Sequence, residues 1–103
     1  MLGLRYIMIT PTLAKFEDLK YNYGALVTKG DDGKEPAIVE GSPADKAGIR
    51  EDDIILEINA IKVMPPQSLS SLIKNYSPGQ TVGLRIARVD KIIVVKVKLD
   101  EFK

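Results

Sequence analysis

Apolar and polar residues alternate along much of this chain, and the alternation predicts a protein built mainly from short β-strands. The pattern is clearest toward the C-terminus, in two runs separated by Val89-Asp90, which predicts a hairpin turn. The apolar positions of these runs are Val82, Leu84 and Ile86, and then Ile93, Val95, Val97 and Leu99. Shorter strand-like stretches lie at residues 4–9, 25–28, 37–39, 53–58 and 61–63. Strict alternation places Leu4, Tyr6 and Met8 on one face of the first stretch, and Ile54, Leu56 and Ile58 on one face of the fourth.

Three segments carry helix signals. Thr10-Pro11 predicts a helix that runs to about Leu19, with Leu13, Phe16 and Leu19 on its apolar side. Residues 42–48 form a complete short helix motif, in which Ser42 caps the start, Pro43 takes the first position, Asp45 lies in the first turn and Gly48 ends it. The longest helix is predicted over residues 67–76, with an apolar stripe of Leu69, Leu72, Ile73 and Tyr76.

The order of these elements predicts the fold class. Five or six short strands and two or three helices follow one another without βαβ regularity, which is typical of a small α+β domain with a curled antiparallel sheet, either a partly open β-barrel or a sandwich. A length of 103 residues fits a single domain over residues 1–103. The longest aliphatic run, Ile92-Ile93-Val94-Val95, is too short to span a bilayer, so no membrane insertion is expected.

The residue counts limit the possible chemistry. The chain has no histidine and no cysteine, which excludes imidazole-activated nucleophiles, thiol catalysis and disulfides. The net charge of +1 comes from mixed lysines and acids, so no nucleic-acid binding is expected. The acidic groups Asp31-Asp32 and Glu51-Asp52-Asp53 lack the spacing of a calcium loop and are interpreted as solvated turns. Ser70 and Lys74 have i,i+4 spacing, but such pairs are common on helices. We therefore expect no catalysis, no metal and no cofactor in this chain.

Three stretches together resemble the PDZ family in the form found in bacterial HtrA/DegP-like, trypsin-like serine proteases. Leu2-Gly3-Leu4 is similar to the hydrophobic-Gly-hydrophobic loop that binds a carboxylate. Residues 40–49 (EGSPADKAGI), continued by residues 53–59 (DIILEIN), are similar to the central motif of these domains. Residues 69–76, followed by Ser77-Pro78-Gly79-Gln80 and Val82, resemble the groove helix and the next strand. The three stretches occur in the family's order over nearly the whole chain.

The resemblance implies a module that captures hydrophobic C-terminal or extended peptide segments by strand addition. The glycine suits a loop whose backbone amides hold a carboxylate, and the strand after it would offer an unpaired edge. The implied peptide-binding residues are Leu2, Gly3, Leu4, Arg5, Tyr6, Ile7, Ser70, Ile73 and Lys74, with Pro66 at the helix side. The aliphatic pocket predicts an apolar terminal side chain on the ligand and dissociation constants of roughly 1–100 µM. We expect Gly3→Val to weaken binding without lowering the melting temperature.

The resemblance also implies a context. The chain would be a fragment of a larger envelope protease that serves protein quality control. The protease would be periplasmic or extracytoplasmic, with or without a membrane anchor, and the isolated domain would be monomeric. Asp52 and Ala60 stand where relatives have glycine, at turns where a positive φ is often wanted. A basic residue that commonly precedes the binding loop has no counterpart here. The alternative is a structural, assembly or autoregulatory module whose groove does not function.

Overall fold

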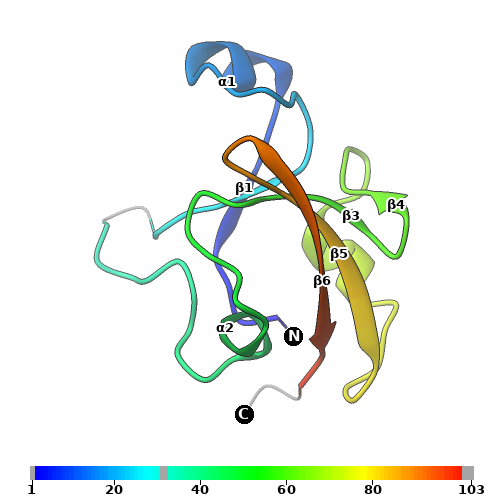
Figure 1. Ribbon diagram of the computed structural model, residues 1–103. Coiled ribbons are helices and arrows are strands. Elements are labelled where there is room, and N and C mark those ends of the chain that lie inside the picture. Colours follow the sequence, from blue (N-terminus) through cyan, green and yellow to red (C-terminus); the bar gives the residue numbers. More distant parts are fainter. Residues whose placement is uncertain (1, 31–32, 101–103) are drawn as a thin grey trace.

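The computed structural model describes residues 2–30 and 33–100, so the expected turn at Asp31 and Asp32 lies outside the described residues. In this part of the chain the elements are β1 (Tyr6–Met8), α1 (Pro11–Phe16), β2 (Ala25–Val27), α2 (Pro43–Ala47), β3 (Ile54–Ile58), β4 (Ile61–Lys62), α3 (Leu69–Ile73), β5 (Thr81–Arg88) and β6 (Lys91–Lys98). All strands join one antiparallel sheet in the order β1-β2-β3-β5-β6, with β4 paired to β3. The predicted α+β class, with a curled and partly open sheet, is confirmed (Figure 1).

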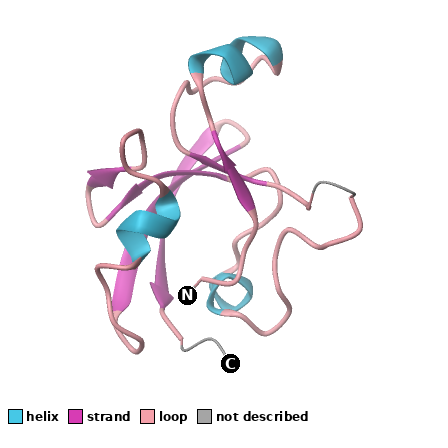
Figure 2. Cartoon of the chain, turned by 180° about the vertical axis from the view of Figure 1, so that it is seen from behind, coloured by secondary structure: helices cyan, strands magenta, loops and turns pink. Residues whose placement is uncertain are grey.

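The sheet curls around the main hydrophobic core. The long β5–β6 ribbon supplies Val82, Leu84, Ile86 and Val97, each at most 1% exposed, as the alternation predicts. Leu4, Tyr6 and Met8 pack together against this core from β1. Helices α2 and α3 lie at the open side of the curl, whereas α1 stands apart beyond the β1–β2 end (Figure 2). This arrangement leaves α3 facing the free edge of β1.

Strand β3 departs from the predicted alternation because it contains a β-bulge. Its register against β5 shifts between Ile55 and Glu57, so Leu56 is an extra residue in the ladder. As a result Ile54 and Leu56 enter a second apolar cluster beneath α1, while Ile58 joins Ile55 in the main core. The prediction that Ile54, Leu56 and Ile58 share one face is therefore wrong at Ile58.

Helix α2 forms as predicted because all its signals are local. The Ser42 hydroxyl accepts a hydrogen bond from the Asp45 amide, Pro43 begins the helix, and Gly48 ends it with φ of 81°. Gly41 N–H in turn donates to the Asp45 carboxylate at 2.8 Å. The helix therefore places Ser42 and Ala44 rigidly beneath the N-terminal loop.

The other two helices are shorter than predicted. In α1 the Thr10 hydroxyl caps the Leu13 amide at 3.0 Å, but the helix ends at Phe16 because Asp18 turns the chain with φ of 54°. Phe16 is 85% exposed, so its placement on the buried side of the helix is wrong. Helix α3 begins after Ser68, which forms a capping box with Ser71, and ends at Ile73. The predicted strand at residues 37–39 is reduced to a single bridge between Leu4 and Ile38.

Two turns adopt the backbone conformation that the sequence predicts. Asp52 has φ of 74° and Ala60 has φ of 68°, so both non-glycine residues lie in the left-handed region, at the two turns where the resemblance implies a positive φ. Each position therefore stores backbone strain of roughly 1 kcal/mol.

Asp53 is not part of a solvated turn, contrary to the prediction. It is 2% exposed and forms a bidentate ion pair with Arg88, with Nε–Oδ1 and Nη2–Oδ2 distances of 2.9 and 2.7 Å. The Arg50 amide donates to the same carboxylate, and Arg88 also donates to the Gly48 carbonyl. The hydrogen bonds that Arg88 donates to the Asp53 carboxylate raise the pKa of Arg88 above its ordinary value. This network joins β3 to β5 and to the end of α2.

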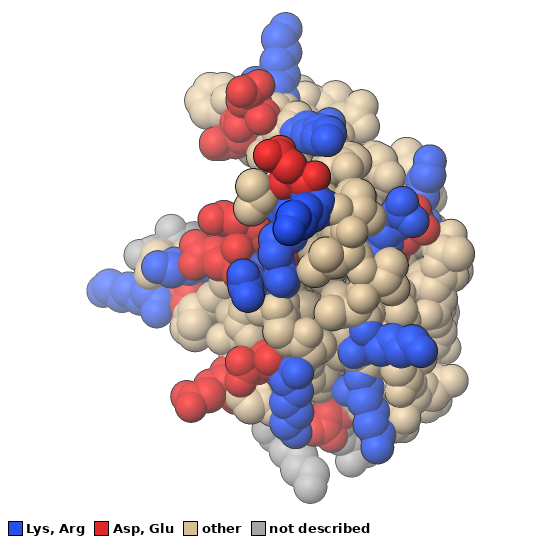
Figure 3. Space-filling view, in the orientation of Figure 1, with Lys and Arg blue, Asp and Glu red and all other residues tan. Residues whose placement is uncertain are grey.

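The surface carries both signs of charge. Lysine, arginine and acidic side chains share the face shown in Figure 3. Within residues 2–30 and 33–100, no helix combines the length and apolar character needed to cross a bilayer. Over the same ranges, no three acidic, cysteine or histidine side chains come close enough to hold a metal ion.

Candidate functional site

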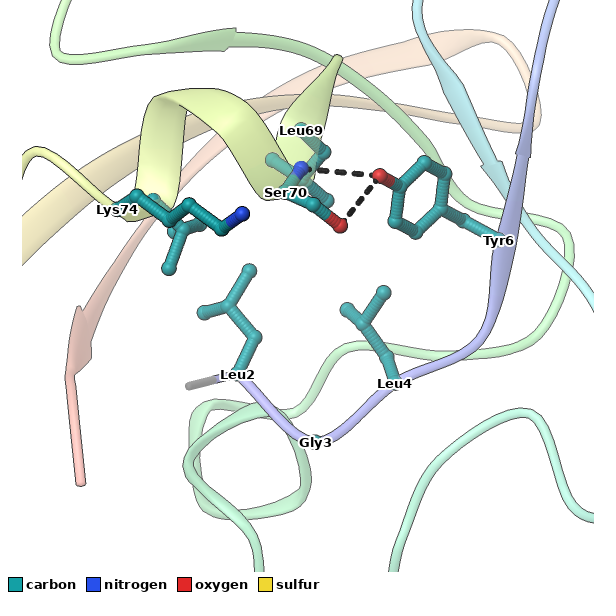
Figure 4. Close-up of a pocket in the computed structure, with 8 residues that line it drawn as sticks. Leu2, Gly3, Leu4, Tyr6, Leu69, Ser70 and Lys74 are labelled. Atoms are coloured by element: carbon teal, nitrogen blue, oxygen red, sulfur yellow. Dashed lines mark hydrogen bonds between the residues drawn. The ribbon is translucent and has the colours of Figure 1, made fainter. Parts of the chain in front are cut away.

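An apolar groove lies between β1 and α3, next to the free edge of β1. Its volume is ≈ 280 Å³. The side chains and loop that surround it come from residues far apart in the sequence, namely Leu2, Gly3, Leu4, Tyr6, Leu69, Ser70, Ile73 and Lys74 (Figure 4). Seven of the nine residues predicted for the site are therefore brought together.

The edge of β1 that faces the groove carries unpaired backbone groups. Arg5 C=O accepts from the Thr28 amide at 3.0 Å, Ile7 pairs with Leu26, and Ile9 N–H donates to Gly24 C=O at 2.9 Å. The Arg5 N–H donates to Ala37 C=O at 2.8 Å, so these backbone hydrogen bonds of the three residues all lie on the side away from the groove. Because backbone groups alternate along a strand, those of Leu4 and Tyr6 point to the opposite edge, toward the groove.

In the loop at Leu2-Gly3-Leu4, the carbonyl groups of Leu2 and Gly3 are fixed on the side away from the groove. Leu2 C=O accepts from the Ala44 amide and Gly3 C=O from the Val39 amide, both at 2.9 Å. In a trans peptide the N–H points opposite to the C=O of the same unit. The N–H of Gly3 is therefore directed away from Ala44 of α2 and the N–H of Leu4 away from Val39, so both are available to an anion, as an anion-binding nest requires.

Gly3 is required by packing as well as by the loop's conformation. Its φ is 82°, and a Cβ built there would lie 2.2 Å from the Ser42 Cβ and 2.6 Å from its hydroxyl. The Ser42 hydroxyl also donates to Gly3 C=O at 3.2 Å. The expectation that Gly3→Val spares stability is thus contradicted, because any side chain at this position collides with the start of α2.

Helix α3 supplies the opposite wall. Leu69, 1% exposed, and the half-buried Ile73 form its apolar surface. Leu69 lines the groove although it is not among the peptide-binding residues that the resemblance implies, and its i,i+4 spacing to Ile73 is the signal that could have placed it there. Pro66, predicted at the helix side, is not among the lining residues.

Polar groups occur at two points of the groove. The Tyr6 hydroxyl lies 2.7 Å from Ser70 Oγ and accepts from the Ser70 amide at 2.9 Å, so it joins β1 directly to α3. Lys74, at the C-terminal end of α3, extends its ammonium group over the cavity (Figure 4). It is the single charged residue among those that line the groove.

Arg5 and Ile7 do not reach the groove, although the sequence placed them among the peptide contacts. The Arg5 guanidinium donates to Pro36 C=O at 2.8 Å and forms an ion pair with Glu35. Ile7 is 42% exposed, and its backbone pairs with Leu26. Alternation along the strand turns both residues away from α3.

The sequence matches a known protein family and is similar to those of known proteins. The family model described as PDZ domain matches residues 1–99. The chain is 36% identical over 97% of its length to the probable periplasmic serine endoprotease DegP-like of Chlamydia trachomatis and 35% identical over 96% to that of Bartonella henselae. It spans 18% of the length of each of these relatives.

Solved structures share the fold. An HtrA3 PDZ domain bound to a phage-derived ligand (FGRWV) superimposes with a TM-score of 0.74 at 20% identity, covering 95% of this chain and 83% of that one. The HtrA-type protease AlgW with decapeptide gives a TM-score of 0.73 at 20% identity, covering 97% of this chain and 28% of that one.

Proposed function

This chain belongs to the PDZ domain family, and we propose that its β1–α3 groove captures the C-terminal end of an extended peptide as an added strand on β1. One observation carries the proposal. Among the described residues, the unpaired edge of β1, the two loop amides and the apolar cavity all meet within one groove. An added strand needs free backbone groups, and a chain end brings one carboxylate and one side chain to place.

Each part of a chain end has a matching group in the groove. The terminal carboxylate would accept hydrogen bonds from the Gly3 and Leu4 amides, with Lys74 as the nearby cation. The backbone of the preceding residues would pair with Leu4 and Tyr6. The terminal side chain would enter the cavity beside Leu2 and Ile73.

The lining supports a preference for apolar termini. Each CH₂ that the cavity buries contributes about 0.8 kcal/mol, so valine, leucine, isoleucine and phenylalanine should bind more tightly than alanine in a graded series. The short peptide loses conformational entropy on binding, which keeps the dissociation constant at roughly 1–100 µM.

The relatives support a role within a larger protein. Because they are named as periplasmic serine endoproteases, we propose that the parent chain is an extracytoplasmic protease of the HtrA type, in which this domain recognises substrate or regulates the protease. The catalytic unit would then lie outside these 103 residues. We expect the isolated domain to be a monomer.

The test is titration of the ¹⁵N-labelled domain with a six-residue peptide that ends in Ala-Ser-Val and has a free carboxylate. A peptide with the same sequence and an amidated end is the matched control. Binding of the free acid, with amide shifts at Gly3, Leu4 and Ile73, would support the proposal. Equal binding of both peptides would refute carboxylate capture, and the absence of binding would favour an assembly or autoregulatory role.

The contribution of Lys74 can be separated from that of the loop. Lys74→Gln should weaken the free-acid peptide roughly two- to fivefold at low salt, with the difference shrinking as salt rises, because an exposed ion pair is weak and screened. Binding of the amidated peptide should not change. Lys46→Gln, on α2 outside the groove, is the matched control. An equal loss for both peptides would show that Lys74 acts by packing instead of by charge.

A further inference from the structure

We propose that the hydrogen-bonded bridge between Tyr6 and Ser70 makes the groove selective for peptides with a small side chain at the third residue from the C-terminus. The inference rests on the proposed function, since it concerns how the same groove reads its ligand. It gives the Tyr6 hydroxyl a role in ligand selectivity, because neither strand pairing nor apolar burial requires a hydroxyl at this position.

The bridge spans the groove from one wall to the other. Tyr6 projects from β1, and its hydroxyl meets both the amide and the hydroxyl of Ser70 in the first turn of α3, at 2.9 and 2.7 Å. No other described side chain that lines the groove makes a hydrogen bond between its two walls. Figure 4 shows this contact at one end of the cavity, with Lys74 toward the other.

The bridge also completes the cap of α3. The Ser68 hydroxyl accepts from the Ser71 amide, and the Ser71 hydroxyl accepts from the Ser68 amide. The Ser70 amide donates across the groove to the Tyr6 hydroxyl. Breaking the contact would remove the partner of a first-turn amide. The two walls are thus held at a separation set by one phenol ring.

Strand pairing determines which ligand residue meets the bridge. An added strand places its residues opposite those of β1, and directly opposed side chains lie on the same face with Cβ atoms roughly 5 Å apart. If the terminal residue enters the cavity next to Leu4, the residue two positions earlier lies opposite Tyr6, because side chains repeat with a period of two. Its side chain must then share the space that the Tyr6 ring occupies.

The size of the side chain at the third ligand residue from the C-terminus determines whether the bridge between Tyr6 and Ser70 remains. Glycine, alanine or serine can lie beside the ring while the bridge remains. A large side chain has to displace the ring and break both hydrogen bonds to Ser70. Loss of one neutral hydrogen bond corresponds to roughly a two- to tenfold change in an equilibrium constant, so the bridge should disfavour a bulky residue by at least about fivefold.

The experiment compares two free-acid hexapeptides, identical except that one ends in Ala-Ser-Val and the other in Phe-Ser-Val. Wild-type protein should bind the first at least about fivefold more tightly. Tyr6→Phe keeps the ring and removes the hydroxyl, so the ratio should fall to within about twofold. Tyr76→Phe removes a hydroxyl outside the groove and should leave the ratio unchanged. Ser70→Ala, which removes the 2.7 Å half of the bridge, should give an intermediate ratio and serves as the second variant if Tyr6→Phe is unstable.

The outcomes separate this inference from the proposed function. Wild-type protein that binds both peptides equally, or a Tyr6→Phe variant that retains the full ratio, would overturn the role of the bridge and leave peptide capture intact. Wild-type protein that binds neither peptide would overturn both. Hydrogen exchange gives a direct readout, since the Ser70 amide should stay protected with the alanine peptide and lose protection with the phenylalanine peptide.

Discussion

The contact between Gly3 and Ser42 gives the sharpest test of how the binding loop is built. The change is Gly3→Ala, alone and combined with Ser42→Gly. A Cβ at position 3 would lie 2.2 Å from the Ser42 Cβ, far inside van der Waals contact, in a residue whose φ is 82°. The clash between the two Cβ atoms depends on Ser42, whereas the cost of the positive φ depends only on the backbone of residue 3.

The magnitudes follow from these two effects. An alanine in the left-handed region costs roughly 1–2 kcal/mol, and overpacking a tight contact costs roughly 1–3 kcal/mol. Gly3→Ala should therefore lower the free energy of unfolding by about 2–5 kcal/mol. Ser42→Gly keeps a tolerated helix cap but loses the hydrogen bond to Gly3 C=O, for a cost of about 1–2 kcal/mol. In the double variant the steric part disappears, so the two effects should be coupled by about 1–3 kcal/mol.

Urea denaturation of the four proteins measures this cycle directly, and thermal denaturation gives an independent check. For a domain of this size each kcal/mol corresponds to roughly 4–8 °C in melting temperature. Additive effects of the two substitutions would show that the alanine methyl group does not meet Ser42. An unchanged melting temperature for Gly3→Ala would refute both the clash and the cost of the positive φ.

Three further predictions concern the core, the groove and the surface. Arg88→Met should destabilise the domain by roughly 3–5 kcal/mol in urea denaturation, because it leaves the buried Asp53 carboxylate without its ion-pair partner. Arg85→Met, at an exposed position of the same strand, is the control, and equal effects of the two substitutions would refute an energetic role for the ion pair. Ile73→Ala should weaken binding of a valine-ended peptide and lower the free energy of unfolding by about 1–2 kcal/mol, since Ile73 is only half-buried. Unchanged affinity would show that Ile73 does not contact the terminal side chain of the peptide. Phe16→Ser should change the free energy of unfolding by less than about 0.5 kcal/mol, as expected for a side chain that is 85% exposed, and a larger loss would show that the ring packs in solution.

Much of the groove could be predicted because its parts follow from local patterns. The α2 caps, the β5–β6 hairpin and the apolar stripe of α3 depend on residues within a few positions of one another. The alternation in residues 4–8 predicts which side chains of β1 face the core, and the same alternation, applied to Arg5 and Ile7, would have excluded their side chains from the groove.

Other features depend on contacts that no local pattern encodes. The bulge at Leu56 arises from pairing with β5, and it sends Ile54 and Ile58 into different clusters although strict alternation predicts one face. The early end of α1 depends on a left-handed turn at Asp18, which leaves Phe16 in solvent.

By itself, the sequence predicted most of the segments that form strands and helices, with residues 37–39 as an exception, and it gave the order of the N-terminal loop, the groove strand and the groove helix. Hydrogen bonds within four residues and the periodicity of side chains are enough for that. The tertiary structure decided the pairs that join distant segments: Gly3 with Ser42 and Tyr6 with Ser70 beside the groove, and Asp53 with Arg88 away from it, which lie 39, 64 and 35 residues apart. Such contacts depend on strand register and on the placement of helices against the sheet, which are settled only when the whole chain packs.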